Sequence, residues 1–308
     1  MASQEANAFH EMLSAGRAAM PADAPMPSLD DTRAGAAMMM QMMGVMPEGV
    51  STTEVALAGA DATLPARWFV PADVVEGRVV LFLHGGGYMM CSSLTHAKLT
   101  AAIAVAARCR VLSIDYRLAP EHRYPAALTD ALVAYRWLLA EGYAPDRIAV
   151  SGDSAGGGLA LGVLLAARAE GLAQPAAAVV LSPMTDLECL SDSMTTHADR
   201  DLQITADFLR HGGRTYVGRD GDLRDPLVSP VHAEYRGIAP IYLQVGGHEV
   251  LLDDSIRVAT AAAHAGVDVR LDVFPEMQHV HQIAVGQLPE ADDAVGRIGA
   301  YLQDRFVR

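Results

Sequence analysis

The stretch that most constrains the fold is a strand, a serine between glycines and a helix in immediate succession. Residues 148–151 (IAVS) are apolar with a β-branched bias, as in a buried parallel strand. GDSAG follows at 152–156, and residues 157–165 are small and apolar, as in a helix packed on a sheet. A turn this tight leaves no room for a Cβ at the two glycine positions of the motif, two residues before and two residues after the serine. The pattern predicts that Ser154 projects above the carboxyl end of a strand, where the following helix begins.

Strand-like and helix-like segments alternate through most of the chain. Apolar runs typical of buried strands lie at 79–83, 110–116, 178–183, 241–246 and 269–274, and helix-like segments at 95–107, 130–140, 254–265 and 290–306. Ahead of them, alternating runs at 52–57 and 64–70, joined by the turn-like Gly59-Ala60-Asp61, predict an antiparallel pair. This order predicts an α/β fold with a mostly parallel, doubly wound sheet.

Two segments depart from the alternation. Residues 1–46 read as helical, interrupted by Pro21, Pro25 and Pro27, and carry the methionine-rich tract AAMMMQMM at 36–43. Methionine is flexible and suits the wall of an adaptable apolar pocket, although such a tract can equally be a helix face packed on the core. Residues 188–223 are polar, contain no strand-like run, and read as inserted helices.

Composition excludes several classes of function. With 51% hydrophobic and 19% charged residues, the 308-residue chain has the composition of a globular protein with a large hydrophobic core. Its net charge of −14 argues against nucleic acid or anionic membranes as partners. Three cysteines, at 91, 109 and 189, suggest reduced thiols in a cytoplasmic setting. The N-terminus has no apolar core of a secretory signal, and we expect no membrane span.

A reactive serine needs a base within hydrogen-bond reach and a carboxylate that orients the base. When the serine sits on such a turn, the acid and then the histidine follow it in the chain. Two late strands end in suitable residues: GHEVLLDD follows the strand at 241–246, and PEMQHVH follows the strand at 269–274. The candidates for acid and base therefore lie on these two loops.

Several motifs in this order carry a family resemblance. They are HGGG at 84–87, DYRLAPEH at 115–122 with YPAA at 124–127, GDSAGG at 152–157, SP at 182–183 with TDL at 185–187, and DPL at 225–227 with SP at 229–230. From about residue 50 onward, the chain resembles the hormone-sensitive-lipase-like esterases, bacterial family IV of the α/β-hydrolases. Within them it is most similar to the branch named monoterpene lactone hydrolases. The resemblance implies an α/β-hydrolase fold: a mostly parallel eight-stranded sheet flanked by helices, a core of residues 47–187 and 225–308, and a helical cap of residues 1–46 and 188–224.

The family register also assigns the acid. Its usual D-x-L-x-D pattern reads EVLLD here, so the acid position falls on Glu249, a departure that remains chemically sound because Glu also serves in triads. Asp253 is the rival, and its alternative role is to cap the following helix.

The same register places the base at His279, two residues after Met277. His281 is the rival, at a position where the family usually has an aromatic residue. His248 is adjacent to the acid but lies at the end of the wrong strand. We therefore expect Ser154, Glu249 and His279 to form the catalytic triad.

The glycine run after residue 83 predicts an oxyanion hole, because glycine lets backbone N–H donors approach the substrate closely. Gly86 and Gly87 are the first choices and Gly85 a further one, with Ala155 donating from the serine turn. The competing interpretation is a phosphate-binding loop, but the lysine that such a loop requires does not follow the glycines. The resemblance gives His84 a role in holding this loop.

These observations predict a serine carboxylesterase that needs no metal or organic cofactor. The resemblance implies that its substrates are short- to medium-chain esters. The proposed pocket walls are Tyr88, Met39, Met40 and Met43. A lactone, amide or thioester would pass through the same tetrahedral oxyanion, so these substrates remain alternatives. A more remote alternative is a non-catalytic small-molecule receptor, as in the plant gibberellin receptors, which resemble this family but lack the catalytic histidine. The resemblance further suggests a homodimer paired through the strand at 269–274.

Overall fold

An eight-stranded sheet forms the centre of the molecule, and the computed structural model describes residues 2–19, 27–58 and 63–306. The strands are β1 (Val50–Ala58), β2 (Thr63–Pro71), β3 (Val79–Leu83), β4 (Arg110–Ile114), β5 (Ile148–Asp153), β6 (Ala177–Leu181), β7 (Ile241–Gly246) and β8 (Val269–Phe274). The helices are α1 (Gln4–Ala18), α2 (Leu29–Met42), α3 (Ala97–Ala107), α4 (Ala126–Ala140), α5 (Ala155–Ala169), α6 (Ser193–Thr196), α7 (Ala206–Val217), α8 (Leu252–His264) and α9 (Pro289–Arg305), with short 3₁₀ turns η1 (Pro145–Arg147), η2 (Pro230–His232) and η3 (His281–Ala284).

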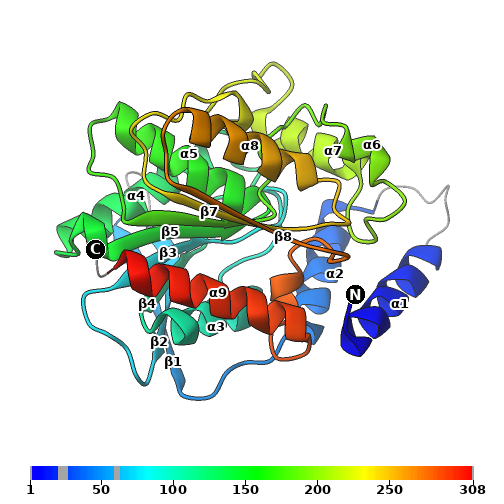
Figure 1. Cartoon of the computed structure of the whole chain (residues 1–308). Helices are drawn as coiled ribbons and strands as arrows, with labels where there is room; N and C mark the ends of the chain where they lie inside the picture. Colours follow the sequence, from blue (N-terminus) through cyan, green and yellow to red (C-terminus); the bar gives the residue numbers. More distant parts are fainter. Residues whose placement is uncertain (1, 20–26, 59–62, 307–308) are drawn as a thin grey trace.

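The strands lie in the order β1-β2-β4-β3-β5-β6-β7-β8 (Figure 1). β1 and β2 form an antiparallel pair, β2 runs antiparallel to β4, and all later neighbours are parallel. The predicted α/β-hydrolase architecture with a mostly parallel eight-stranded sheet is therefore confirmed. The turn predicted at 59–61 and the breaks at Pro21 and Pro25 lie outside the described residues.

The central strands are buried on both faces, as their unbroken apolar runs predicted. On β3, Val79, Leu81 and Leu83 pack in one core cluster with α4, α5 and α8, while Val80 and Phe82 pack in a second cluster with α3 and α9. This alternation follows from the two-residue period of a strand. Figure 1 shows the same helices on opposite faces of the sheet.

The parallel strands place four loops at one edge of the sheet. β3 ends before the glycine run that starts at Gly85, β5 ends at the residue before Ser154, β7 ends just before the loop with Glu249, and β8 ends just before the loop with His279. Because these strands belong to one parallel set, their carboxyl ends face the same way. The fold thus brings together residues that are far apart in the sequence.

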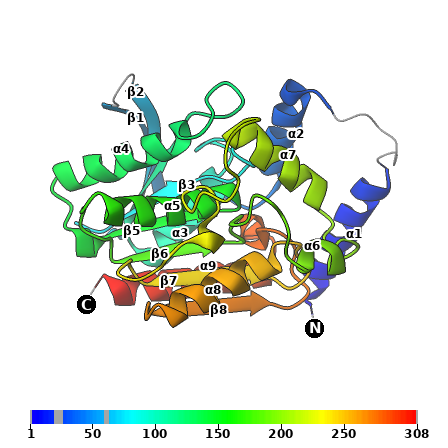
Figure 2. The ribbon, with the colours of Figure 1, turned by 90° about the horizontal axis from the view of Figure 1, so that it is seen from above.

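Four helices gather at this end of the molecule. Both views place α1 and α2, from the first 46 residues, near α6 and α7, from the insert after β6 (Figures 1 and 2). Within the described residues, no helix has the length and apolar character needed to cross a bilayer. The division of the chain into cap and core remains a prediction.

Candidate active site

Ser154 lies at the turn between β5 and α5, and its backbone has a conformation that residues other than glycine rarely adopt. Its φ is 53° and its ψ is −122°, a strained combination that costs on the order of 1–3 kcal/mol. A Cβ on Gly152 would overlap the carbonyl oxygen of Gly156, and a Cβ on Gly156 would overlap that of Leu83. The two glycines therefore allow β5 to pass directly into α5, with Ser154 at the wall of a cavity.

A chain of hydrogen bonds joins this serine to the two late loops. His279 Nε2 lies 3.0 Å from Ser154 Oγ, and His279 Nδ1 lies 2.8 Å from Glu249 Oε2. Glu249 is fully buried, and its Oε1 accepts hydrogen bonds from Ser182 Oγ (2.6 Å) and the Gly246 amide (2.5 Å). The carboxylate is thus fixed from both sides and holds the imidazole with Nε2 toward the serine.

The surroundings of His279 favour its charged form. Burial alone would lower the pKa of this imidazole, but the hydrogen bond and the negative charge of Glu249 outweigh burial and raise it above the usual value. The charges of Asp201 and Asp153 act in the same direction. A base of this kind takes up a proton readily, as general-base catalysis requires.

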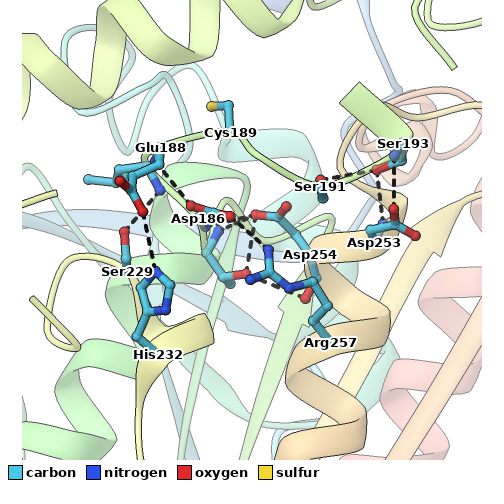
Figure 3. A network of polar contacts seen from close by, with 12 residues as sticks. Asp186, Glu188, Cys189, Ser191, Ser193, Ser229, His232, Asp253, Asp254 and Arg257 are labelled. Atoms are coloured by element: carbon cyan, nitrogen blue, oxygen red, sulfur yellow. Dashed lines mark hydrogen bonds and ion pairs between the residues drawn. The ribbon is translucent and has the colours of Figure 1, made fainter. Parts of the chain in front are cut away.

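The rival residues lie elsewhere. Asp253 is in the first turn of α8, and its Oδ2 accepts from the Ser193 amide (2.8 Å), so it caps α6 rather than α8 (Figure 3). His281 is buried against the ring of Phe274, and neither of its ring nitrogens has a partner within the described ranges. His248 lies beside the ring of His10. The geometry therefore brings together only the three residues favoured from the sequence.

The oxyanion-hole prediction needs one correction. The Gly85 amide donates to Asp153 Oδ1 (3.0 Å), so it is engaged inside the protein and not available to a substrate. In the part of the chain that the structure describes, no acceptor pairs with the amides of Gly86, Gly87 or Ala155. Gly86 and Gly87 also line the cavity beside the serine. These three amides remain as candidate donors.

A buried polar group that sequence analysis missed holds the glycine loop in place. Asp153, the residue before the serine, receives the Gly85 amide through Oδ1, and its Oδ2 lies 3.2 Å from His96 Nε2. His84 stacks on Tyr116 (ring centroids 4.3 Å apart), whose hydroxyl donates to the His84 carbonyl (2.7 Å). Burial, with a further contribution from nearby His96, lowers the pKa of His84 to about 3, so this ring is neutral. No spacing in the sequence links residues 84, 96 and 153.

A cavity of about 600 Å³ opens over Ser154 and His279. Met39 and Met40 line it as predicted, but Tyr88 and Met43 do not. Tyr88 is buried and stacks face to face on Tyr216 (3.8 Å), because its φ of 63° turns the side chain into the core. Met43 follows the last residue of α2 in extended conformation, which takes it off the helical face. Further apolar wall residues, which the sequence did not indicate, come from α1, α7 and the loop before α7: Met12, Leu13, Leu202, Ile204, Phe208 and Leu209.

Known proteins resemble the chain along most of its length. The family profile described as the alpha/beta hydrolase fold matches residues 80–283. An acetyl-hydrolase of Streptomyces hygroscopicus is 43% identical over 239 residues, covering 77% of this chain and 79% of its own. The carboxylesterase/phospholipase LipF of Mycobacterium tuberculosis is 36% identical over 266 residues, covering 83% and 70%. The crystal structure of an esterase from the bacterial hormone-sensitive lipase family matches with a TM-score of 0.92 at 40% identity, covering 99% of both chains.

The chain belongs to the hormone-sensitive-lipase-like family of α/β-hydrolase esterases. The resemblance to this family, which the sequence motifs indicated, is therefore confirmed. The chain is a carboxylic ester hydrolase.

One group of side chains in this esterase has the composition of a metal site. Asp186, Glu188 and His232 bring potential ligand atoms within 4.8 Å of one another (Figure 3). Arginines already pair with both carboxylates, since Arg257 Nη1 lies 2.7 Å from Asp186 and Arg224 Nη1 lies 3.6 Å from Glu188. None of the three side chains lines the cavity. The group is therefore accounted for by the ion pairs of the chain itself.

Proposed function

We propose that the chain is a serine carboxylesterase that acts through an acyl-enzyme. The hydrogen-bonded series from the buried Glu249 through His279 to Ser154, at 2.8 Å and 3.0 Å, carries this proposal, and its last two residues line the apolar cavity. A binding protein without chemistry would not require this arrangement, since a serine hydroxyl becomes nucleophilic only when a positioned base can take its proton.

The steps follow from the positions of these groups. Ser154 Oγ attacks the ester carbonyl carbon while His279 Nε2 takes the hydroxyl proton, and Glu249 stabilises the imidazolium. The amides of Gly86, Gly87 and Ala155 donate to the oxygen of the tetrahedral intermediate. When the intermediate collapses, the alcohol leaves with the proton from His279, and the acyl group stays on Ser154. Water then attacks the acyl-enzyme by the same route and releases the acid.

The cavity supports short- to medium-chain esters as substrates. Its volume lies within the range of small-molecule sites, and side chains such as Met40, Leu202 and Phe208 offer apolar contact rather than hydrogen bonds. Residues 1–46 and 188–224 would together form the cap that supplies these walls. A lactone, such as a substrate of the monoterpene lactone branch, a thioester or an amide would use the same triad, and only a substrate panel separates them.

The decisive experiment compares two buried serines. Ser154→Ala removes the proposed nucleophile, whereas Ser113→Ala removes a buried hydroxyl on β4 that has no hydrogen-bond partner among the described residues. Hydrolysis of p-nitrophenyl butyrate is expected to fall at least about 10⁴-fold in the first variant and to persist in the second. A sulfonyl fluoride should label the peptide that contains Ser154. Normal turnover by Ser154→Ala would remove the proposal, and a panel of esters, lactones and anilides would define the substrate class.

A further inference from the structure

A short segment between α6 and α7, residues 200–204, contacts both loops that carry the proposed acid and base. The segment begins within a turn in which the amides of Arg200 and Asp201 donate to the His197 carbonyl. Leu202, Gln203 and Ile204 form part of the cavity wall. The segment thus borders the substrate space through these three residues and the triad loops through its other contacts.

Asp201 connects the segment to the loop of the acid. Its side chain is completely buried, and Oδ2 accepts from the amide of Val250, the residue after Glu249, at 2.9 Å. Oδ1 accepts from the amides of Gln203 and Ile204, both at 3.0 Å. A carboxylate can accept on both sides, whereas an amide cannot, because its nitrogen end is a donor. The position therefore requires an acid.

Gln278 connects the segment to the loop of the base. This buried side chain is adjacent in sequence to His279, and it bonds the segment twice. Its Oε1 accepts from the Leu202 amide (2.8 Å), and its Nε2 donates to the Arg200 carbonyl (2.9 Å). On the outer side, Arg17 of α1 donates to the carbonyls of Asp201 and Ala198. The segment is thus bonded to three separate parts of the chain.

We propose that Asp201 and Gln278 are positioning residues, which hold Glu249 and His279 in register through their shared contacts with residues 200–204. This inference rests on the proposed triad. Neither side chain needs to touch the substrate: each acts through the neighbouring triad residue. A displacement of about 1 Å between reacting groups can cost on the order of 10²-fold in rate, so buried contacts of this kind bear directly on turnover.

Asp201 has a second effect through its charge. Three carboxylates act on the imidazole of His279: Glu249 by hydrogen bond and charge, and Asp201 and Asp153 by charge, all of which raise its pKa. Activity needs the neutral imidazole, so activity is lost as the pH falls through this pKa. Removing the charge of Asp201 lowers the pKa, and the acid limb of the pH profile moves to lower pH.

The test uses two variants that separate position from charge. Gln278→Met keeps the approximate volume and removes both hydrogen bonds without changing the charge. It is expected to lower kcat on p-nitrophenyl butyrate by about 10- to 100-fold with a nearly unchanged KM and an unmoved acid limb. Asp201→Asn is expected to lower kcat similarly and also to shift the acid limb of kcat/KM to lower pH.

Asp130→Asn is the matched control. This buried carboxylate anchors the loop after β4 by binding Arg117, and it makes these bonds away from the triad loops. We expect the acid limb of kcat/KM for Asp130→Asn to coincide with that of the unmodified enzyme. Thermal melts identify any variant that fails to fold, and Gln278→Met, which introduces no charge, keeps the test decisive if Asp201→Asn unfolds.

Two outcomes would overturn the inference while leaving the proposed function intact. One is an unchanged kcat in folded Gln278→Met, and the other is a raised KM with normal kcat, which would make residues 200–204 only a cavity wall. An active Ser154→Ala enzyme would instead refute the triad itself.

Discussion

Replacing Glu249 by glutamine isolates what the carboxylate contributes. The side chain is isosteric, so its oxygen can still accept from Ser182 and Gly246, which lie at 2.6 Å and 2.5 Å. Its nitrogen end then faces His279 Nδ1, where the carboxylate oxygen stood at 2.8 Å. An amide N–H donates, so Nδ1 must accept and the ring hydrogen moves to Nε2. The ring then cannot take the proton of Ser154.

The expected loss follows from this wrong tautomer. A buried triad acid replaced by its amide lowers kcat by about 10⁴-fold, which corresponds to about 5 kcal/mol in the activation barrier. The pKa of His279 should also fall, because the charge that raises it is gone, so the acid limb of any residual activity should lie at lower pH. The assay is steady-state hydrolysis of p-nitrophenyl butyrate across pH, with a thermal melt to verify folding.

Asp253→Asn makes the same chemical change at the rival position. Asp253 accepts from the Ser193 amide, a bond that the new amide oxygen can keep, and it does not contact His279. We expect activity within about threefold of the unmodified enzyme, as for a substitution outside the machinery. If Asp253→Asn lost as much activity as Glu249→Gln, or if Glu249→Gln stayed within tenfold of normal, the assignment of the acid would be wrong.

Two further predictions concern stability and assembly. His281→Phe should raise the stability by about 1–2 kcal/mol at neutral pH, because it removes a buried ring whose nitrogens have no partner in the described chain. Burial lowers the pKa of His281 to about 3, so the unfolded chain binds a proton between about pH 6.5 and pH 3 that the folded chain does not. The advantage of the variant should therefore grow as the pH falls, and urea midpoints at pH 7.5 and 5.5 measure it. For assembly, light scattering at micromolar concentration should give about twice the chain mass of 32.6 kDa, and Val273→Lys on the edge strand β8 should halve it. A native monomer, or equal stabilities of His281→Phe and the unmodified protein at both pH values, would contradict these expectations.

The sequence was most informative where a strand pattern runs directly into a motif. Strand ends in a parallel sheet face one edge, so periodicity and order predicted Ser154 before a helix and a base on the loop after β8. The family register then selected His279 over His281 on that loop. For the acid, the family register left two candidates, Glu249 as first choice and Asp253 as its rival. The structure shows Glu249, not Asp253, bonded to the imidazole.

The errors arose where backbone dihedrals determine the direction of a side chain. Gly85 and Gly86 look equivalent in sequence, yet only the Gly85 amide turns toward Asp153. Tyr88 points into the core because of one positive φ angle, and Met43 left the helical face because α2 ends one residue earlier. Composition and periodicity contain no signal for such local turns.

The backbone of Ser154 has a consequence for the evolution of this protein. At its φ of 53°, a glycine would have no steric strain, whereas a β-branched residue would clash with the backbone. Folding stability and reactivity therefore make opposite demands at this one position. A population selected only for heat resistance would drift away from the nucleophile, and hydrolysis has to be under continuous selection for the serine to persist.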